Sequence, residues 1–151
     1  MTITPDHVDV RGPRFVAWVT TAVLVVTLLS AAVDETAAAV LLAAQAAVFA
    51  IGAIRGPRSH PYGVLFARFV APRLGPVTDT EPVPPLKFAQ VVGLVFAVVG
   101  VAGFALGLSP LGLTATAFAL FAAFLNAAFG ICLGCQLYPL AVRLRRSPAH
   151  S

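Results

Sequence analysis

The sequence predicts an all-α protein: an integral membrane four-helix bundle with a cytoplasmic amphipathic loop helix at the membrane interface. Composition is the first reason, because 59% of the 151 residues are hydrophobic and only 11% are charged. An average soluble domain has about 25% charged residues. The other two reasons are four long apolar segments and a one-sided distribution of Lys and Arg. The length suits a single bundle, so residues 1–151 are expected to form one membrane domain.

The four apolar segments are each long enough to cross the hydrocarbon core of a bilayer. That core is about 30 Å thick and needs about 20 apolar residues in a helix. Each segment must be helical, because lipid offers no water to the backbone polar groups. The expected spans are 15–33, 36–54, 88–108 and 113–135, with a loop at 55–87 between the second and the third.

The basic residues all lie on one side of these spans. Asp34 and Glu35 separate the first two spans, and the uncharged stretch SPLG joins the last two. The ten basic residues are Arg11, Arg14, Arg55, Arg58, Arg68, Arg73, Lys87, Arg143, Arg145 and Arg146. The positive-inside rule predicts that both termini and the 55–87 loop face the cytoplasm. Because these residues flank apolar segments, we expect them to meet lipid headgroups and not nucleic acid.

An alternative for the first span is a cleaved signal peptide, since LLSAAVD offers small residues near its end. Asp6 and Asp9 before the span, and the length of its apolar run, are unlike such a peptide. Cleavage would also leave an odd number of spans. We therefore expect the first span to be retained.

The central loop contains a segment with helical periodicity, HPYGVLFARFVAPRLGP. Its large apolar residues recur at spacings of three and four, with Arg68 on another face; they are Tyr62, Leu65, Phe66, Phe69 and Val70. This pattern predicts a short amphipathic helix at the interface, which Pro72 ends. A loop without helix across the inner surface is the alternative. The proline-rich stretch GPVTDTEPVPPL predicts an extended connector.

The two cysteines of the chain, Cys132 and Cys135, stand in a C-x-x-C frame at the end of the fourth span. Counting helical residues from Leu113 puts Cys132 near the inner edge of the membrane and Cys135 in or beyond the interface. Residues three apart share a helix face, so the thiols can meet. Pro139 cannot donate to the carbonyl of Cys135, which favours a local kink and closure of a disulfide.

Two geometries remain open for this segment. If the fourth helix continues unbroken, the cysteines lie near its C-terminal end, where the helix dipole disfavours a thiolate. If it breaks at Gly130, they begin a new interfacial helix whose N-terminal dipole favours a thiolate. Nearby arginines would favour a thiolate in both cases.

The chemistry of the pair is also open among a redox dithiol, a sulfur or persulfide relay, a metal site and inert packing. A closed metal site needs about four ligands, and His60, His7 and His150 offer no second pair at ligand spacing. Only a homo-oligomer, with two protomers supplying four thiolates, would provide the four ligands of such a metal site. We expect no metal and no cofactor, and the sequence shows no phosphate-binding glycine loop, paired carboxylates or nucleophile elbow.

Polar residues within the spans are costly unless partnered, so they indicate packing or function. Gln45 and Asn126 are expected to hold helices together through amide hydrogen bonds. Gln90 should lie at about the depth of the cysteines, where it either packs or orients a thiol. His60, at the mouth of the loop, is either a proton donor or an ordinary interfacial residue.

Four stretches resemble a bacterial membrane family known as domain of unknown function 4395: RGPRF, APRLGP, PPLKFAQ and LNAAFGICLGCQLY. The resemblance covers nearly the whole chain. Its most specific part comprises Asn126, Cys132, Leu133, Gly134, Cys135, Leu137 and Tyr138. Lys87 stands where the family pattern has an arginine. The resemblance implies the bacterial cytoplasmic membrane but no assigned activity. Members tend to be encoded near thioredoxin-like and rhodanese-like proteins, which implies thiol or sulfur chemistry.

The leading hypothesis is a membrane protein in which Cys132 and Cys135 cycle between dithiol and disulfide. A cytoplasmic thioredoxin-like or rhodanese-like sulfurtransferase protein would be the partner, with Gln90, Asn126, Pro139 and His60 as supporting residues. The rival is a non-catalytic membrane scaffold or small transporter subunit in which the cysteines only pack.

Overall fold

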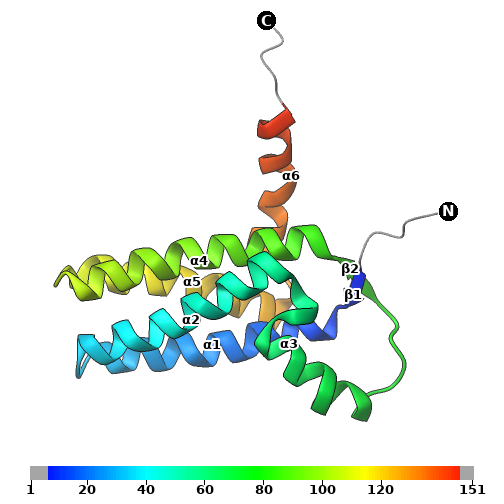
Figure 1. The fold of residues 1–151 in the computed structure, drawn as a ribbon, viewed down its shortest axis with the longest axis horizontal. Helices are drawn as coiled ribbons and strands as arrows, with labels where there is room; N and C mark the ends of the chain where they lie inside the picture. The colour runs from blue at the N-terminus through cyan, green and yellow to red at the C-terminus, as the bar shows by residue number, and fades with distance from the viewer. Residues whose placement is uncertain (1–6, 147–151) are drawn as a thin grey trace, which may run out of the picture.

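The computed structural model describes residues 7–146, and its main feature is a bundle of four long helices (Figure 1). These helices are α1 (Arg11–Ala31), α2 (Glu35–Arg55), α4 (Val83–Ala105) and α5 (Ser109–Phe129). All four are long and apolar enough to cross a membrane. The predicted all-α membrane bundle is therefore confirmed.

The two ends of the bundle differ in charge. One end carries the short turns between α1 and α2 and between α4 and α5 (Figure 1). There the Asp34 carboxylate accepts the Thr36 N–H and caps α2, and the Ser109 hydroxyl donates to Glu35 Oε1 at 2.7 Å. The other end carries the N-terminal segment, the long loop and the last helix, which together with the adjoining helix ends contain every basic residue.

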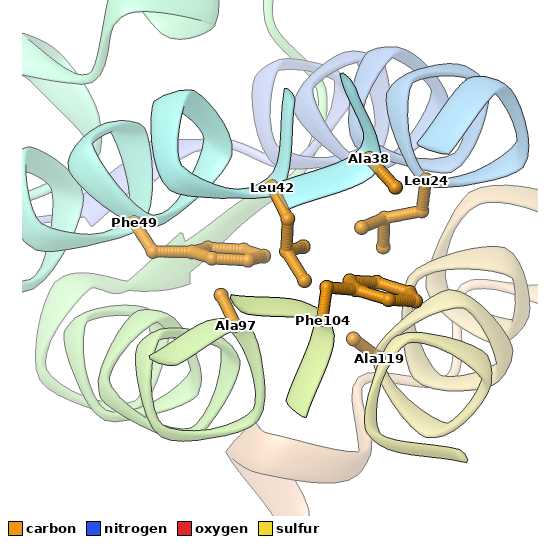
Figure 2. Packing of buried hydrophobic residues seen from close by; sticks show 7 residues of the cluster. All are labelled: Leu24, Ala38, Leu42, Phe49, Ala97, Phe104 and Ala119. Atoms are coloured by element: carbon orange, nitrogen blue, oxygen red, sulfur yellow. The ribbon is translucent and has the colours of Figure 1, made fainter. Parts of the chain in front are cut away.

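The core lies along the bundle axis and is built from a few large and many small side chains (Figure 2). Leu24, Ala38, Leu42, Phe49, Ala97, Phe104 and Ala119 form one buried cluster contributed by all four long helices. The outer faces are also apolar: Leu29 is 66% exposed, and Phe118 and Phe121 are each 57% exposed. Helices that are apolar all round suit a lipid surrounding.

The long loop is helical where the sequence predicted a helix. After a 3₁₀ turn, η1 (Pro57–Ser59), the chain forms α3 (Pro61–Leu65), a π turn, η2 (Phe66–Val70), and a 3₁₀ turn, η3 (Ala71–Arg73). The helical path continues one residue beyond Pro72, because proline fits the first positions of a 3₁₀ turn. Phe66 is buried against Phe15, with ring centroids 5.7 Å apart, whereas Phe69 is 55% exposed.

A small antiparallel sheet, which the sequence pattern did not indicate, ties the N-terminal segment to the extended connector. Strand β1 (His7–Asp9) pairs with β2 (Thr80–Pro82). Asp9 and Arg11 form an ion pair at 2.7 Å, which holds the pKa of the Asp9 carboxyl below its usual value. Strands of three residues are too short for an alternating pattern to be visible.

The helix expected to run from Leu113 to Cys135 is shorter: α5 ends at Phe129, where Gly130 adopts a left-handed conformation at φ 70°. Such a glycine is a common helix C-cap. A separate helix, α6 (Leu133–Arg146), then runs across the bundle axis and away from it (Figure 1). The long helices also begin earlier than expected: α1 at Arg11, and α4 at Val83 with prolines in its first turn.

Candidate functional site

The two cysteines lie at the start of α6, so the broken-helix geometry is the one that the structure has. A disulfide joins Cys132 and Cys135, whose Cα atoms are 5.2 Å apart. Cys132 occupies the N-cap position: its carbonyl accepts the Gln136 N–H at 3.0 Å, and its Sγ accepts the Cys135 N–H at 3.1 Å. Both cysteines are half-buried.

Helix α6 is seated on α4 by a close contact and a ring pair. Gly134 is buried against Ala89, and a Cβ at position 134 would come within 2.6 Å of the Ala89 Cα. Beyond it, the rings of Phe88 and Tyr138 meet edge to face at 5.8 Å. These contacts hold the disulfide against the side of the bundle.

The prediction that arginines lie near the cysteines needs correction. Arg143, Arg145 and Arg146 lie in the last turn of α6, far along the helix from the disulfide, because the cysteines begin a new helix. The basic residue placed near the break is Arg14 of α1, whose guanidinium donates to the carbonyl of Ala127 at 3.1 Å. It thus satisfies a free carbonyl at the C-terminal end of α5.

A cavity of about 110 Å³ lies inside the bundle next to Cys132. The leading hypothesis from the sequence named two cysteines and four supporting residues. Four of these six residues line the cavity: Cys132, Gln90, Asn126 and His60. They come from the cysteine loop, α4, α5 and the segment before α3. Cys135 and Pro139 do not line it, and Pro139 lies exposed within α6.

His60 is not the loop-mouth residue that the sequence predicted, because it is buried at 1% exposure inside the end of the bundle that carries the cysteines. Its Nδ1 accepts the Tyr62 N–H at 3.2 Å, so the ring proton is on Nε2, which lies 3.1 Å from Gln90 Oε1 and donates to it. Burial lowers the pKa of His60 to about 4. The imidazole is neutral at neutral pH and acts as a hydrogen-bond donor, not as a charged acid.

Tyr62 and Gly52 are site residues that the sequence reasoning missed. Tyr62 was expected at the interface, but its hydroxyl reaches into the bundle and donates to Gln45 Oε1 at 2.7 Å. Gly52 leaves room for the His60–Gln90 pair, since a Cβ there would come within 2.6 Å of His60 Cδ2. Gln45 and Gly52 are seven residues apart and share a helix face. This spacing was the signal in the sequence that could have placed both residues at one site.

Gln45 makes an interhelical hydrogen bond of the kind expected of it, because its side-chain carbonyl accepts from Tyr62. Its amide nitrogen is buried without a hydrogen-bond partner in residues 7–146. Within the same described range, there is no group of three or more His, Cys, Asp or Glu side chains that could hold a metal ion. His150, considered above as a ligand, lies outside the described residues.

Comparison with known proteins supplies a family but no activity. The chain has no significant match among curated proteins or among solved structures. One family model, with the description Domain of unknown function (DUF4395), matches residues 8–143. That range includes the four long helices, the central loop and both cysteines. The chain therefore belongs to the DUF4395 family.

Proposed function

We propose that this protein is a membrane thiol–disulfide exchange protein whose working pair is Cys132 and Cys135. The observation that carries the proposal is the disulfide at the start of α6, with Cys132 at the N-cap and facing a cavity. A reduced Cys132 would be stabilised as a thiolate there by the helix N-terminus and by the Cys135 N–H. Reactive dithiols are commonly found at helix N-termini.

The exchange follows ordinary disulfide chemistry. The Cys132 thiolate attacks one sulfur of a partner disulfide, forms a mixed disulfide and releases the other partner sulfur as a thiolate. Cys135 then attacks Cys132, which closes the internal disulfide and releases the second partner thiolate. Two electrons pass to the partner, and the reverse sequence passes them back. The pair should have a midpoint potential between about −120 and about −270 mV, the range of thioredoxin-like proteins.

The charge distribution supports a cytoplasmic partner in the bacterial cytoplasmic membrane. Every Lys and Arg lies at the end of the bundle that carries the cysteines or beyond it in α6, and the positive-inside rule places that end in the cytoplasm. The partner would be a thioredoxin-like or rhodanese-like protein. It would meet the half-buried disulfide beside α6.

Trapping a partner tests the proposal. In Cys135→Ser the resolving thiol is gone, so Cys132 should retain its partner as a mixed disulfide, seen on a non-reducing gel after acid quenching and alkylation. Cys132→Ser is the matched control and should retain much less. If the purified wild-type thiols stay free in oxidised glutathione, and neither variant retains a partner, the cysteines only pack and the scaffold or transporter interpretation holds.

A further inference from the structure

The cavity beside Cys132 has one closed side and one open side. Its walls from α1 and α2, among them Val16, Thr20 and Phe49, are buried. The lining residues from α4, α5 and the cysteine loop are mostly half-buried, including Val92, Ala122 and Cys132. The cavity is partly open. Because the half-buried lining residues come mainly from α4, α5 and the cysteine loop, we infer that it opens on that side, next to the disulfide. Both helices are candidate membrane spans, and a bilayer would place lipid at that opening.

The chemistry of the cavity favours a neutral ligand with hydrogen-bond acceptors. Among residues 7–146, no charged side chain lines it, so an anion would lose its hydration without gaining a cation as partner. Gln90 accepts from His60 through Oε1, which leaves its amide nitrogen as a donor. Within residues 7–146 no hydrogen bond involves that nitrogen or the side-chain amide of Asn126. Gln90 and Asn126 thus bring two side-chain amides to the lining of an otherwise largely apolar space.

The size of the cavity suits one six-membered ring. A cavity of about 150 Å³ lined by apolar side chains is enough to bind benzene. The space beside Cys132 is about 110 Å³ and is also open on one side, so a ring can extend beyond the enclosed volume.

We propose that this cavity binds the ring of a lipid-soluble quinone, which accepts electrons from the Cys132–Cys135 dithiol. This inference rests on the proposed function, because it names the electron acceptor of the same pair. Gln90 and Asn126 donate hydrogen bonds to the quinone oxygens, and Cys132 is the sulfur that faces the ring. The two thiols lose two electrons and two protons as the S–S bond forms, and the quinone gains both to become a quinol. A thioredoxin-like partner then supplies electrons for the next cycle by disulfide exchange.

Quinone reduction by the full-length protein tests the inference. The protein is placed in phosphatidylcholine nanodiscs, reduced with dithiothreitol, desalted without oxygen and mixed with decylubiquinone. The ring of this quinone is fully substituted and offers no C–H position at which a thiol could add. The ultraviolet absorbance should show one quinol formed per two thiols lost. Gln90→Leu should slow the reaction about five- to tenfold, the effect of losing one hydrogen bond.

A matched pair of variants on α5 distinguishes filling of the cavity from a general effect of an added leucine on quinone reduction. Ala122→Leu fills the opening and should block quinone reduction, whereas Ala117→Leu on the exposed side of α5 should not alter it. Each variant is first titrated in glutathione buffers, where it must form the disulfide as the wild type does.

The outcomes separate the two proposals. If the wild-type pair forms its disulfide in glutathione but reduces no quinone, this inference fails and the exchange function stands. Quinone reduction that is unaffected by Ala122→Leu also overturns the assignment of the cavity. If the disulfide never forms in glutathione, both proposals fall.

Discussion

At the scale of single residues, small side chains decide how closely the cysteine helix approaches the bundle. Gly134 touches Ala89 of α4 so closely that no Cβ fits between them. The neighbouring contact between Phe88 and Tyr138 fixes the same helix further along. The position of the disulfide beside the cavity therefore depends on a residue that has no side chain.

Replacing Gly134 with alanine should destabilise the protein. The added Cβ forces α6 away from Ala89, and such overpacking costs about 1–3 kcal/mol of the free energy of unfolding. Thermal unfolding in detergent measures the loss. Gly75→Ala is the control, since no atom of the described part of the chain lies within 4 Å of its Cβ position, and it should unfold as the wild type does. Equal unfolding temperatures for the two variants would show that α6 is not seated on α4.

His60 should make the stability of the protein depend on pH. Its pKa falls from 6.5 to about 4 on folding, so between these values the unfolded chain binds the proton and the folded protein does not. Stability is thus complete above about pH 7 and is lost as the pH falls, by about 2 kcal/mol at pH 5. Thermal unfolding at pH 8 and pH 5 measures this loss. His60→Gln should show a smaller loss; an unchanged loss would mean that His60 is not buried.

At the scale of elements, the loop helix is held to the bundle by one of its two central phenylalanines. The pattern of α3 and η2 predicted that Phe66 and Phe69 act together at the interface. The structure separates them, because Phe66 packs on Phe15 and Phe69 is exposed. Tyr62 adds a second anchor through Gln45. The segment thus covers the end of the bundle that carries the cysteines and keeps His60 buried.

Phe66→Ala should loosen this segment, and Phe69→Ala should not. Truncating a buried phenylalanine costs about 3 kcal/mol or more, whereas an exposed one contributes little. Trypsin cleavage after the exposed Arg68 in purified protein reports the opening of the segment. We expect cleavage at least about tenfold faster in Phe66→Ala than in Phe69→Ala. Equal rates would indicate that the loop is not anchored through Phe66.

At the scale of the whole molecule, the charge asymmetry of the sequence becomes an asymmetry of the two bundle ends. One end of the bundle carries the short α1–α2 and α4–α5 turns, and the other carries the long loop and α6 (Figure 1). The α1–α2 turn contains Asp34 and Glu35, whereas the cysteines and every Lys and Arg lie at the opposite end or in α6. One orientation in the membrane therefore places every basic residue on the cytoplasmic side.

Labelling of single cysteines in intact cells checks this orientation in a Cys132→Ser, Cys135→Ser background. Val33→Cys lies in the α1–α2 turn, where the native side chain is 90% exposed, and should react with a membrane-impermeant thiol reagent. Val77→Cys in the connector, where the native side chain is 54% exposed, should react only after permeabilisation. The reverse pattern would overturn the orientation and with it the cytoplasmic partner.

The sequence by itself determined the class of fold, because a bilayer leaves few choices to a long apolar segment. Such a segment must be a helix, and the four expected spans correspond to the four long helices of the bundle. The loop helix and the extended connector as far as Pro82 also followed from local spacing and from proline, whereas the residues from Val83 to Leu86 form the first turn of α4. These signals are local, since each depends on neighbours within a few residues.

Only the tertiary structure decided where the chemistry lies. Local spacing left open whether the helix breaks at Gly130, and it is the fold that turns α6 away and packs Gly134 on Ala89. His60, Gln90 and the segment from Asn126 to Cys132 are far apart in the chain, and they share one cavity because separate elements meet there. Hydropathy and periodicity describe how one segment meets its solvent and do not describe which segments meet one another. The shape of the site depends on which segments pack against one another, and that is decided by the tertiary structure.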